Sequence, residues 1–180
     1  MNVRIDISNV ILKTDRLILR PWTIEDLDDF YEYAKVDGVG QMAGWYPHKN
    51  KEETLMILNM FIDEKKTFAI EYNGKVIGSI GIEEYNEELL PEFADKAGRE
   101  LGFVLSKDYW GRGFMPEAVK GVINYLFDEL KLDVIVCGHF NKNIQSKRVQ
   151  EKCGFKPYKM HKSITAYGTV EDHCINILNK

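Results

Sequence analysis

Gly111 and Gly113 flank Arg112 at a point of the chain where the backbone can come close to a ligand. An apolar, strand-like segment precedes these residues, and an amphipathic helical pattern with Pro116 in its first turn follows them. Glycine tolerates unusual backbone dihedrals, while a helix N-terminus offers unpaired N–H groups and a partial positive charge. The order of strand, glycine turn and helix therefore predicts an anion site, most often one for phosphate.

Two common phosphate-binding patterns do not fit this segment. The P-loop requires four residues between its glycines and a following Gly-Lys-Ser/Thr, which the chain lacks. The dinucleotide fingerprint requires three glycines and an acidic residue about 20 positions later, but only Gly111 and Gly113 are present. Neither nucleotide class is therefore indicated.

Four segments, taken in order, resemble the GNAT acyltransferase superfamily. The glycine segment is similar to the signature Gln/Arg-x-x-Gly-x-Gly/Ala, with Trp110 in its first place and Met115 in its last. The other matches are Thr14–Arg20, Arg99–Phe103 and Asn143–Phe155. Together they look like the branch that acetylates the N-termini of ribosomal proteins and related amines. The resemblance covers nearly the whole chain, whereas any one motif alone is a weak signal.

The resemblance implies a site for acetyl-CoA as co-substrate, without a metal ion. Backbone N–H groups of the glycine turn and helix start would face the pyrophosphate. The pantetheine arm would pair with a strand at a gap where two strands splay apart, and a backbone N–H there would hold the oxyanion. The implied cofactor-binding residues are Phe103, Val104, Leu105, Gly111, Arg112, Gly113, Phe114, Met115, Asn143 and Ser146.

Asn143 and Ser146 each leave two interpretations open. The resemblance implies that the Asn143 amide bonds the pantetheine, although Asn is also a favoured helix cap. It places Ser146 near the cofactor sulfur, where a hydroxyl can protonate the leaving thiolate, although a first-turn surface serine is an alternative. Ser146 is therefore both a cofactor-binding and a catalytic candidate.

Acetyl transfer to an amine needs a base, because an ammonium group has no lone pair and amine pKa values lie near 8 to 10.4. Glu100, on the strand expected beside the cofactor, is the candidate base; a surface-facing glutamate is the competing interpretation. Glu83 and Glu84 are reserve bases. Two residues used by other family members are replaced here by Gly138 and Gln150.

The resemblance implies direct transfer of acetyl to a primary amine, such as a protein N-terminus or a small amine, within a ternary complex. Other acetyltransferase acceptors, namely an antibiotic, a polyamine or a free amino acid, remain open because acceptor pockets are built from variable loops. A non-catalytic acyl-CoA-binding module is the alternative from a different class. Trp45, Tyr46 and His48 are candidates for the acceptor wall.

Composition narrows the class of protein. The chain has 180 residues, 44% of them apolar, and a formal net charge of −4, which fits one globular domain spanning residues 1–180. Without a polybasic run or a long apolar segment, we expect neither nucleic-acid nor membrane partners. Three widely spaced cysteines read as reduced thiols, and no signal core is evident. We expect a cytoplasmic monomer or homodimer.

The elements that must position these residues indicate a mixed α/β protein. The GNAT fold implies a twisted central sheet of about seven strands with flanking helices. Asn73-Gly74 predicts a tight hairpin, and residues 99–139 predict a strand–helix–strand crossover between parallel strands. We expect strands near residues 11–20, 67–72, 75–85, 99–106, 134–139, 156–162 and 170–178. We expect one helix that starts at Thr23, one that is capped by Asn50, one that starts near Pro116 and ends at about Leu130, and one over residues 144–152.

Overall fold

The computed structural model of the protein describes residues 1–165 and 168–180. Within these residues the strands are β1 (Leu12–Lys13), β2 (Ile18–Pro21), β3 (Thr67–Tyr72), β4 (Lys75–Glu83), β5 (Gly98–Leu105), β6 (Val134–Phe140), β7 (Lys156–Ile164) and β8 (Val170–Asn179). The α-helices are α1 (Leu27–Ala34), α2 (Lys51–Glu64), α3 (Phe114–Asn124) and α4 (Ile144–Lys152). Short helical turns are η1 (Ile24–Asp26), η2 (Gly40–Ala43), η3 (Pro91–Phe93), η4 (Lys107–Tyr109) and the π-helical η5 (Tyr125–Glu129).

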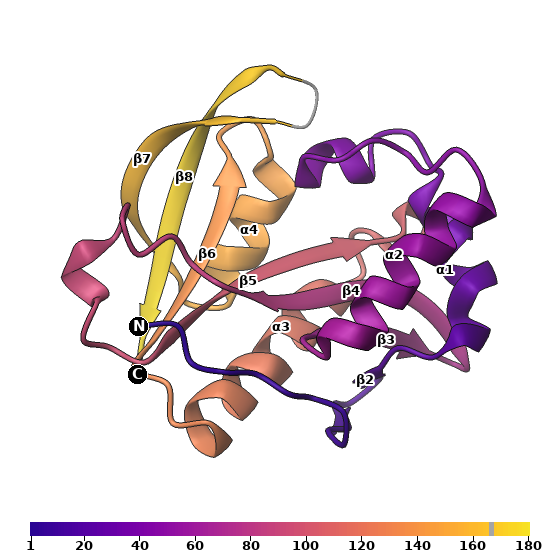
Figure 1. The fold of residues 1–180 in the computed structure, drawn as a ribbon, viewed down its shortest axis with the longest axis horizontal. Helices are drawn as coiled ribbons and strands as arrows, with labels where there is room; N and C mark the ends of the chain where they lie inside the picture. The colour runs from indigo at the N-terminus through magenta and orange to yellow at the C-terminus, as the bar shows by residue number, and fades with distance from the viewer. Residues whose placement is uncertain (166–167) are drawn as a thin grey trace.

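The strands form one sheet in the order β1-β2-β3-β4-β5-β6-β8-β7 (Figure 1). Neighbouring strands are antiparallel except β5 and β6, which run parallel and are connected through α3. The mixed α/β class and the parallel crossover predicted from the sequence are confirmed. The connection through α3 is what brings the glycine segment to the end of β5.

Local sequence signals account for several element boundaries. Asn73 and Gly74 have φ values of 51° and 76°, as a type I′ turn requires, and they join β3 to β4. The side chain of Asn50 accepts a hydrogen bond from Glu53 N at 2.8 Å and begins α2. α4 has the predicted bounds, residues 144–152.

The first strand is divided, and the expectation of one strand over residues 11–20 is wrong. β1 and β2 pair as a short antiparallel hairpin, with Leu12 opposite Leu19. Thr14 closes the turn between them, because its N–H donates to Leu17 O at 3.0 Å and its hydroxyl accepts from Leu17 N at 3.1 Å. This hairpin raises the strand number to eight.

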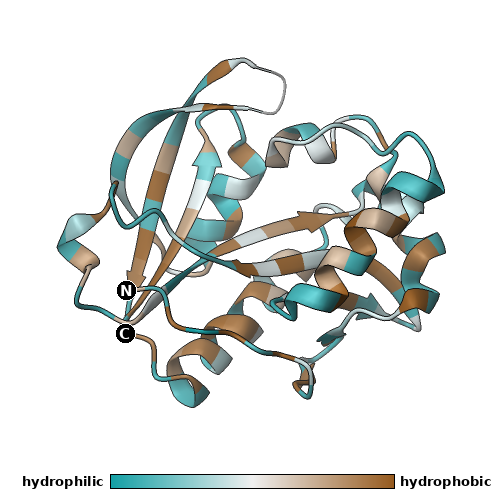
Figure 2. Ribbon diagram, viewed as in Figure 1, coloured by the Kyte–Doolittle hydropathy of each residue, from teal (hydrophilic) through white to brown (hydrophobic). Residues whose placement is uncertain are grey.

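Helices cover both faces of the sheet (Figure 1). On one face, α1 and α2 pack with Trp22, Phe30 and Leu58 in one buried cluster. On the other, α3 and the end of α4 contribute Val119 and Cys153 to the main core. Figure 2 shows hydrophobic residues along the central strands and along α3. The sheet therefore separates two compartments, and a side chain on β5 enters one or the other by alternation.

β5 and β6 pair over only part of their length. Their register runs from Gly98 opposite Val134 to Leu101 opposite Cys137 and stops there. β5 nevertheless continues to Leu105 and β6 to Phe140. The two strands therefore part beyond Leu101 and Cys137, and this opening is the gap that the sequence analysis anticipated.

Candidate active site

A cavity of about 310 Å³ lies at the opening between β5 and β6. Four segments meet there: η2, the end of β5, the glycine turn with the start of α3, and the start of α4. The cavity brings together nine of the predicted cofactor-binding residues: Phe103, Val104, Leu105, Gly111, Gly113, Phe114, Met115, Asn143 and Ser146. It is large enough for part of a long ligand, with the α3 N-terminus at its wall.

The glycine turn has the backbone conformation that its sequence predicts. Gly111 and Gly113 have φ values of 74° and 78°, in the left-handed region that favours glycine. No heavy atom lies within 4 Å of the position that a Gly111 side chain would occupy. Gly113 is the N-cap of α3, whose first N–H groups have no intrahelical acceptor. The turn therefore offers open backbone N–H groups to an anion.

The two departures from the family signature each have a structural role. Trp110 donates its indole N–H to Leu105 O at 2.8 Å, which ties the turn to the end of β5. Met115 is 5% exposed and belongs to the same core cluster as Val119. Met115 therefore fills core volume, and its backbone still belongs to the first turn of α3.

Arg112 is the one predicted residue of the turn that does not line the cavity. Its guanidinium lies over the rings of Phe114, Tyr109 and Tyr72, at 4.9, 5.5 and 5.7 Å from their centroids. Its carbonyl oxygen accepts a hydrogen bond from Arg16 Nη1 at 3.0 Å. The side chain thus stabilises the outside of the turn through cation–π contacts.

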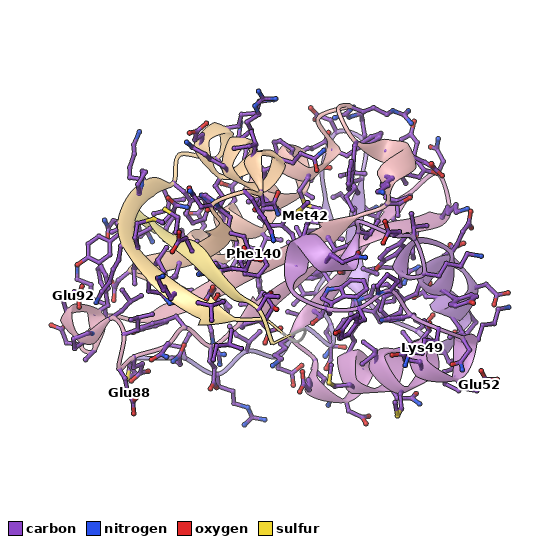
Figure 3. The ribbon with its side chains drawn as sticks, turned by 90° about the horizontal axis from the view of Figure 1, so that it is seen from above. Met42, Lys49, Glu52, Glu88, Glu92 and Phe140 are labelled. Atoms are coloured by element: carbon purple, nitrogen blue, oxygen red, sulfur yellow. The ribbon has the colours of Figure 1, made fainter. Side chains whose placement is uncertain are left out.

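Asn143 is a helix cap, as one of its two interpretations predicts. Its Oδ1 accepts from Ser146 N at 3.0 Å, and its Nδ2 donates to Met42 O at 3.0 Å. Figure 3 labels Met42 of η2 near Phe140, the last residue of β6. The amide of Asn143 therefore fastens η2 over the opening, and its predicted contact with the cofactor stays a prediction.

Sequence reasoning missed a buried amide network behind Ser146. Gln150 donates through Nε2 to Ser146 Oγ and to Gly138 O, both at 3.0 Å. Its Oε1 accepts from Asn176 Nδ2 at 2.6 Å. Gln150 was considered only as the replacement of a family acid, and no short pattern around it in α4 indicates that its side chain is buried. The network links the cavity wall to β6 and β8.

Glu100 lies where β5 and β6 are about to part. Leu101 belongs to the core on the α3 side, so Glu100 faces the side of α1 and α2. A Cβ placed on Gly138 would be 3.4 Å from Glu100 Oε1. Burial raises the pKa of Glu100 to about 7, and the nearby negative charge of Glu83 adds to this effect. Glu100 does not line the cavity itself.

The other candidates from the sequence are engaged elsewhere. Glu83 forms an ion pair with Lys66 at 2.7 Å, and Glu84 forms one with Arg99 at 3.6 Å. His48 is buried and shares a hydrogen bond of 2.9 Å with Thr54 Oγ1. The cavity lining includes none of the proposed wall residues Trp45, Tyr46 and His48.

The three cysteines are free and buried. Burial raises the pKa of Cys137 and of Cys174, and raises that of Cys153 to about 11. A thiol with a raised pKa is a poor nucleophile at neutral pH. The three cysteines are therefore poor candidates for the nucleophile of an acyl-enzyme.

Within residues 1–165 and 168–180, no three His, Cys, Asp or Glu side chains are grouped as a metal site would require. None of the helices in this part of the chain combines the length and apolar character needed to cross a membrane.

A family model described as an acetyltransferase (GNAT) domain matches residues 16–156. The chain belongs to the GNAT acetyltransferase family. It is therefore an acetyl-CoA-dependent acetyltransferase, and the glycine turn at the α3 N-terminus lies where the GNAT signature stands.

The chain is also similar in sequence to curated N-acetyltransferases. The N-acetyltransferase YoaA of Bacillus subtilis is 32% identical over 153 residues, which cover 81% of this chain and 82% of that protein. YjcK of the same organism is 43% identical over 81 residues, or 44% of this chain. That alignment spans 45% of the length of YjcK.

Solved structures share the fold. An acetyltransferase of the GNAT family from Bacillus anthracis has a TM-score of 0.82 and 24% identity, covering 94% of this chain and 98% of that one. The ribosomal-protein-S5-alanine acetyltransferase from Vibrio fischeri has a TM-score of 0.73 and 19% identity, covering 95% and 97%. The microcin C7 self immunity acetyltransferase MccE, solved with acetyl-CoA and AMP, has a TM-score of 0.75 and 16% identity, covering 92% and 93%.

Proposed function

We propose that the protein transfers acetyl directly from acetyl-CoA to a primary amine, with Glu100 as general base and Ser146 as the donor to the departing sulfur. The position of Glu100 carries the proposal, because it stands where β5 and β6 part and has a pKa raised to about 7. A base with this pKa accepts and releases protons readily near neutral pH.

The cavity supports the assignment of the acetyl-CoA site to Phe103, Val104 and Leu105 with the glycine turn and the α4 start. Beyond Leu101 the backbone of β5 is not paired with β6, so it can pair with an extended amide-containing arm. The α3 N-terminus supplies N–H groups and a favourable dipole for the pyrophosphate. We assign Arg112 a backbone role only, since its side chain lies on the outer aromatic rings.

Each proton in the proposed reaction has a destination. The acceptor ammonium gives one proton to Glu100, which passes it to solvent before the attack. The neutral nitrogen then forms the C–N bond as the C–S bond breaks, and Glu100 takes a second proton from this nitrogen, so that one N–H remains in the amide. The departing thiolate takes a proton from Ser146, whose hydroxyl solvent restores. Because Ser146 Oγ already accepts from Gln150 Nε2 at 3.0 Å, its own hydrogen is available for donation. Glu100 then releases its proton to solvent.

A protein N-terminus is the acceptor that we favour. The chain resembles the branch that acetylates ribosomal-protein N-termini. An α-amine with a pKa near 8 is also closer to a base of pKa about 7 than a lysine of 10.4 is. Small amines, including antibiotics, polyamines and amino acids, are the alternative acceptors, and a non-catalytic acyl-CoA-binding module is the alternative from another class.

A thiol-release screen tests the proposal. Acetyl-CoA is incubated with N-terminal peptides, polyamines and aminoglycosides, and the acetylated product is identified by mass. We expect free CoA thiol with at least one primary amine, and a loss of about 10²-fold or more in rate for Glu100→Gln. Tight CoA binding without turnover of any acceptor would instead support the binding module.

Three further assignments belong to this proposal. We propose that residues 1–180 act as one domain, since one sheet extends from β1 at one edge to β7 at the other. We also propose a cytoplasmic location, which the three free cysteines support. The assembly is a monomer or a homodimer, and sedimentation of the purified chain distinguishes them.

A further inference from the structure

His161 and His173 face each other across the two strands of the β7–β8 hairpin. His161 Nε2 lies 2.8 Å from His173 Nδ1, and the rings meet edge-on with centroids 4.9 Å apart. His161 Nδ1 lies 3.2 Å from Lys162 O. Because a backbone carbonyl can only accept a hydrogen bond, neutral His161 carries its hydrogen on Nδ1.

This contact determines which nitrogen of His173 is protonated. His161 Nε2 has no hydrogen in this tautomer, so it accepts from His173 Nδ1–H. A neutral His173 then has an unprotonated Nε2 with a free lone pair. The hydrogen bond from His173 Nδ1–H to His161 thus leaves His173 Nε2 as a hydrogen-bond acceptor.

The unprotonated Nε2 of His173 lies over Gly138. A Cβ placed on Gly138 would be 2.3 Å from His173 Cε1 and 2.7 Å from His173 Nε2. The same position is 3.4 Å from Glu100 Oε1. Because Gly138 has no side chain, the imidazole from β8 and the carboxyl from β5 can approach one place on β6, directly after the last residue paired with β5.

We propose that His173 is a substrate-positioning residue, whose Nε2 accepts the N–H of the acceptor amine that remains in the amide product. This inference rests on the proposed function and gives a structural reason for its restriction to primary amines. A primary amine has one N–H for Glu100 and a second for His173, whereas a secondary amine has only the N–H that must leave. His173 takes no proton in the reaction.

The surrounding charges leave the lone pair of His173 available. Burial lowers the pKa of His173 to about 4, and His161 and His139 add to this effect. On the neighbouring strands, the carboxyl groups on the same face of the sheet as His173 are Glu100 of β5 and Glu83 of β4, which stand opposite each other. His173 also packs edge-on against Phe140, with ring centroids 5.5 Å apart. It is therefore neutral throughout the pH range in which Glu100 titrates.

A pair of variants separates hydrogen bonding from packing. His173→Phe keeps a ring of similar size but has no acceptor, whereas His173→Gln keeps an acceptor atom. Removing a hydrogen bond to a reacting nitrogen corresponds to about 10- to 100-fold in rate or affinity. For His173→Phe we expect kcat/KM for a primary amine to fall by this factor, while the KM for acetyl-CoA stays unchanged. The preference for the primary amine over its N-methyl derivative should also decrease. His173→Gln should recover most of the loss.

The tautomer of His173 can be measured directly in the protein without substrates. Nitrogen NMR of labelled imidazoles should show Nδ1 protonated and Nε2 unprotonated for His173 at pH 7, and a mixture of tautomers in His161→Phe. A protonated Nε2 would overturn the inference, as would equal losses in His173→Phe and His173→Gln, or no loss in either. Thiol release by the unaltered protein tests the proposed function separately, so the two failures are distinguishable.

Discussion

Glu83 and Glu100 stand directly opposite each other on β4 and β5. Lys66 neutralises the first through an ion pair of 2.7 Å, while burial and the charge of Glu83 raise the pKa of the second to about 7. One carboxyl of the pair is thus tied to a cation, and the other is placed in the range of a general base.

Loss of Lys66 should raise the pKa of Glu100 further. In Lys66→Met the negative charge of Glu83 is no longer compensated, so the pKa of Glu100 should rise by up to about one unit. The rising limb of the rate profile should shift to higher pH by the same amount. Lys75→Met is the matched control, since Lys75 pairs with Glu32 at 2.6 Å on α1. An equal shift in both variants would contradict the coupling.

Glu100 should also affect stability. A carboxyl whose pKa is raised by folding adds stability below its unfolded pKa, and this contribution is lost as the pH rises through about 7. The unaltered protein should therefore lose stability between pH 4 and pH 8 that Glu100→Gln keeps. The difference in free energy of unfolding between variant and unaltered protein should shift in favour of the variant by on the order of 1–3 kcal/mol over this range. Urea unfolding at both pH values measures this difference. Glu84→Gln, at a side chain that is 72% exposed, should show almost none of it.

The glycine turn can be tested with a matched glycine elsewhere. Gly113 and Gly74 have φ values of 78° and 76°, and neither would bring a Cβ closer than 3.5 Å to another atom. Alanine at either position should lower the free energy of unfolding by about 1–2 kcal/mol. Only Gly113→Ala should raise the KM for acetyl-CoA, because only this glycine caps α3 at the cavity. A KM effect of equal size in Gly74→Ala would remove the turn from its proposed role.

Ser146 should affect the rate of acetyl transfer and not the binding of acetyl-CoA. We expect Ser146→Ala to lower kcat about 10- to 100-fold with little change in the KM for acetyl-CoA, because the hydroxyl is needed mainly as the thiolate leaves. Ser8→Ala, which removes only an exposed hydrogen bond to Asp6, is the control. Steady-state kinetics with a saturating acceptor give both constants. An unchanged kcat would assign the proton to water.

Local signals in the sequence were sufficient where the partners are near each other in the chain. Asn73-Gly74 predicted its hairpin and Asn50 predicted the start of α2, because each depends on its own backbone or on the next few residues. The division of β1 from β2 was missed, since the alternating pattern does not reveal that the Thr14 hydroxyl and backbone close a turn with Leu17.

Long-range contacts were not predictable in the same way. The glycine turn, β5 and the α4 start were assigned to one cavity through their resemblance to a known family, and the cavity contains nine of those residues. The bond of Gln150 to Asn176 joins α4 to β8. The placement of His173 over Gly138 depends on strand order in the sheet. No short motif encodes either contact.

The pH dependence of kcat/KM tests the central claim most directly, with the best acceptor from the screen and the unaltered protein beside Glu100→Gln. We predict a rate that rises with pH through a pKa of about 7, as Glu100 loses its proton, and the loss of that limb in Glu100→Gln. A profile with the same limb and the same rate in both proteins would contradict the role of Glu100.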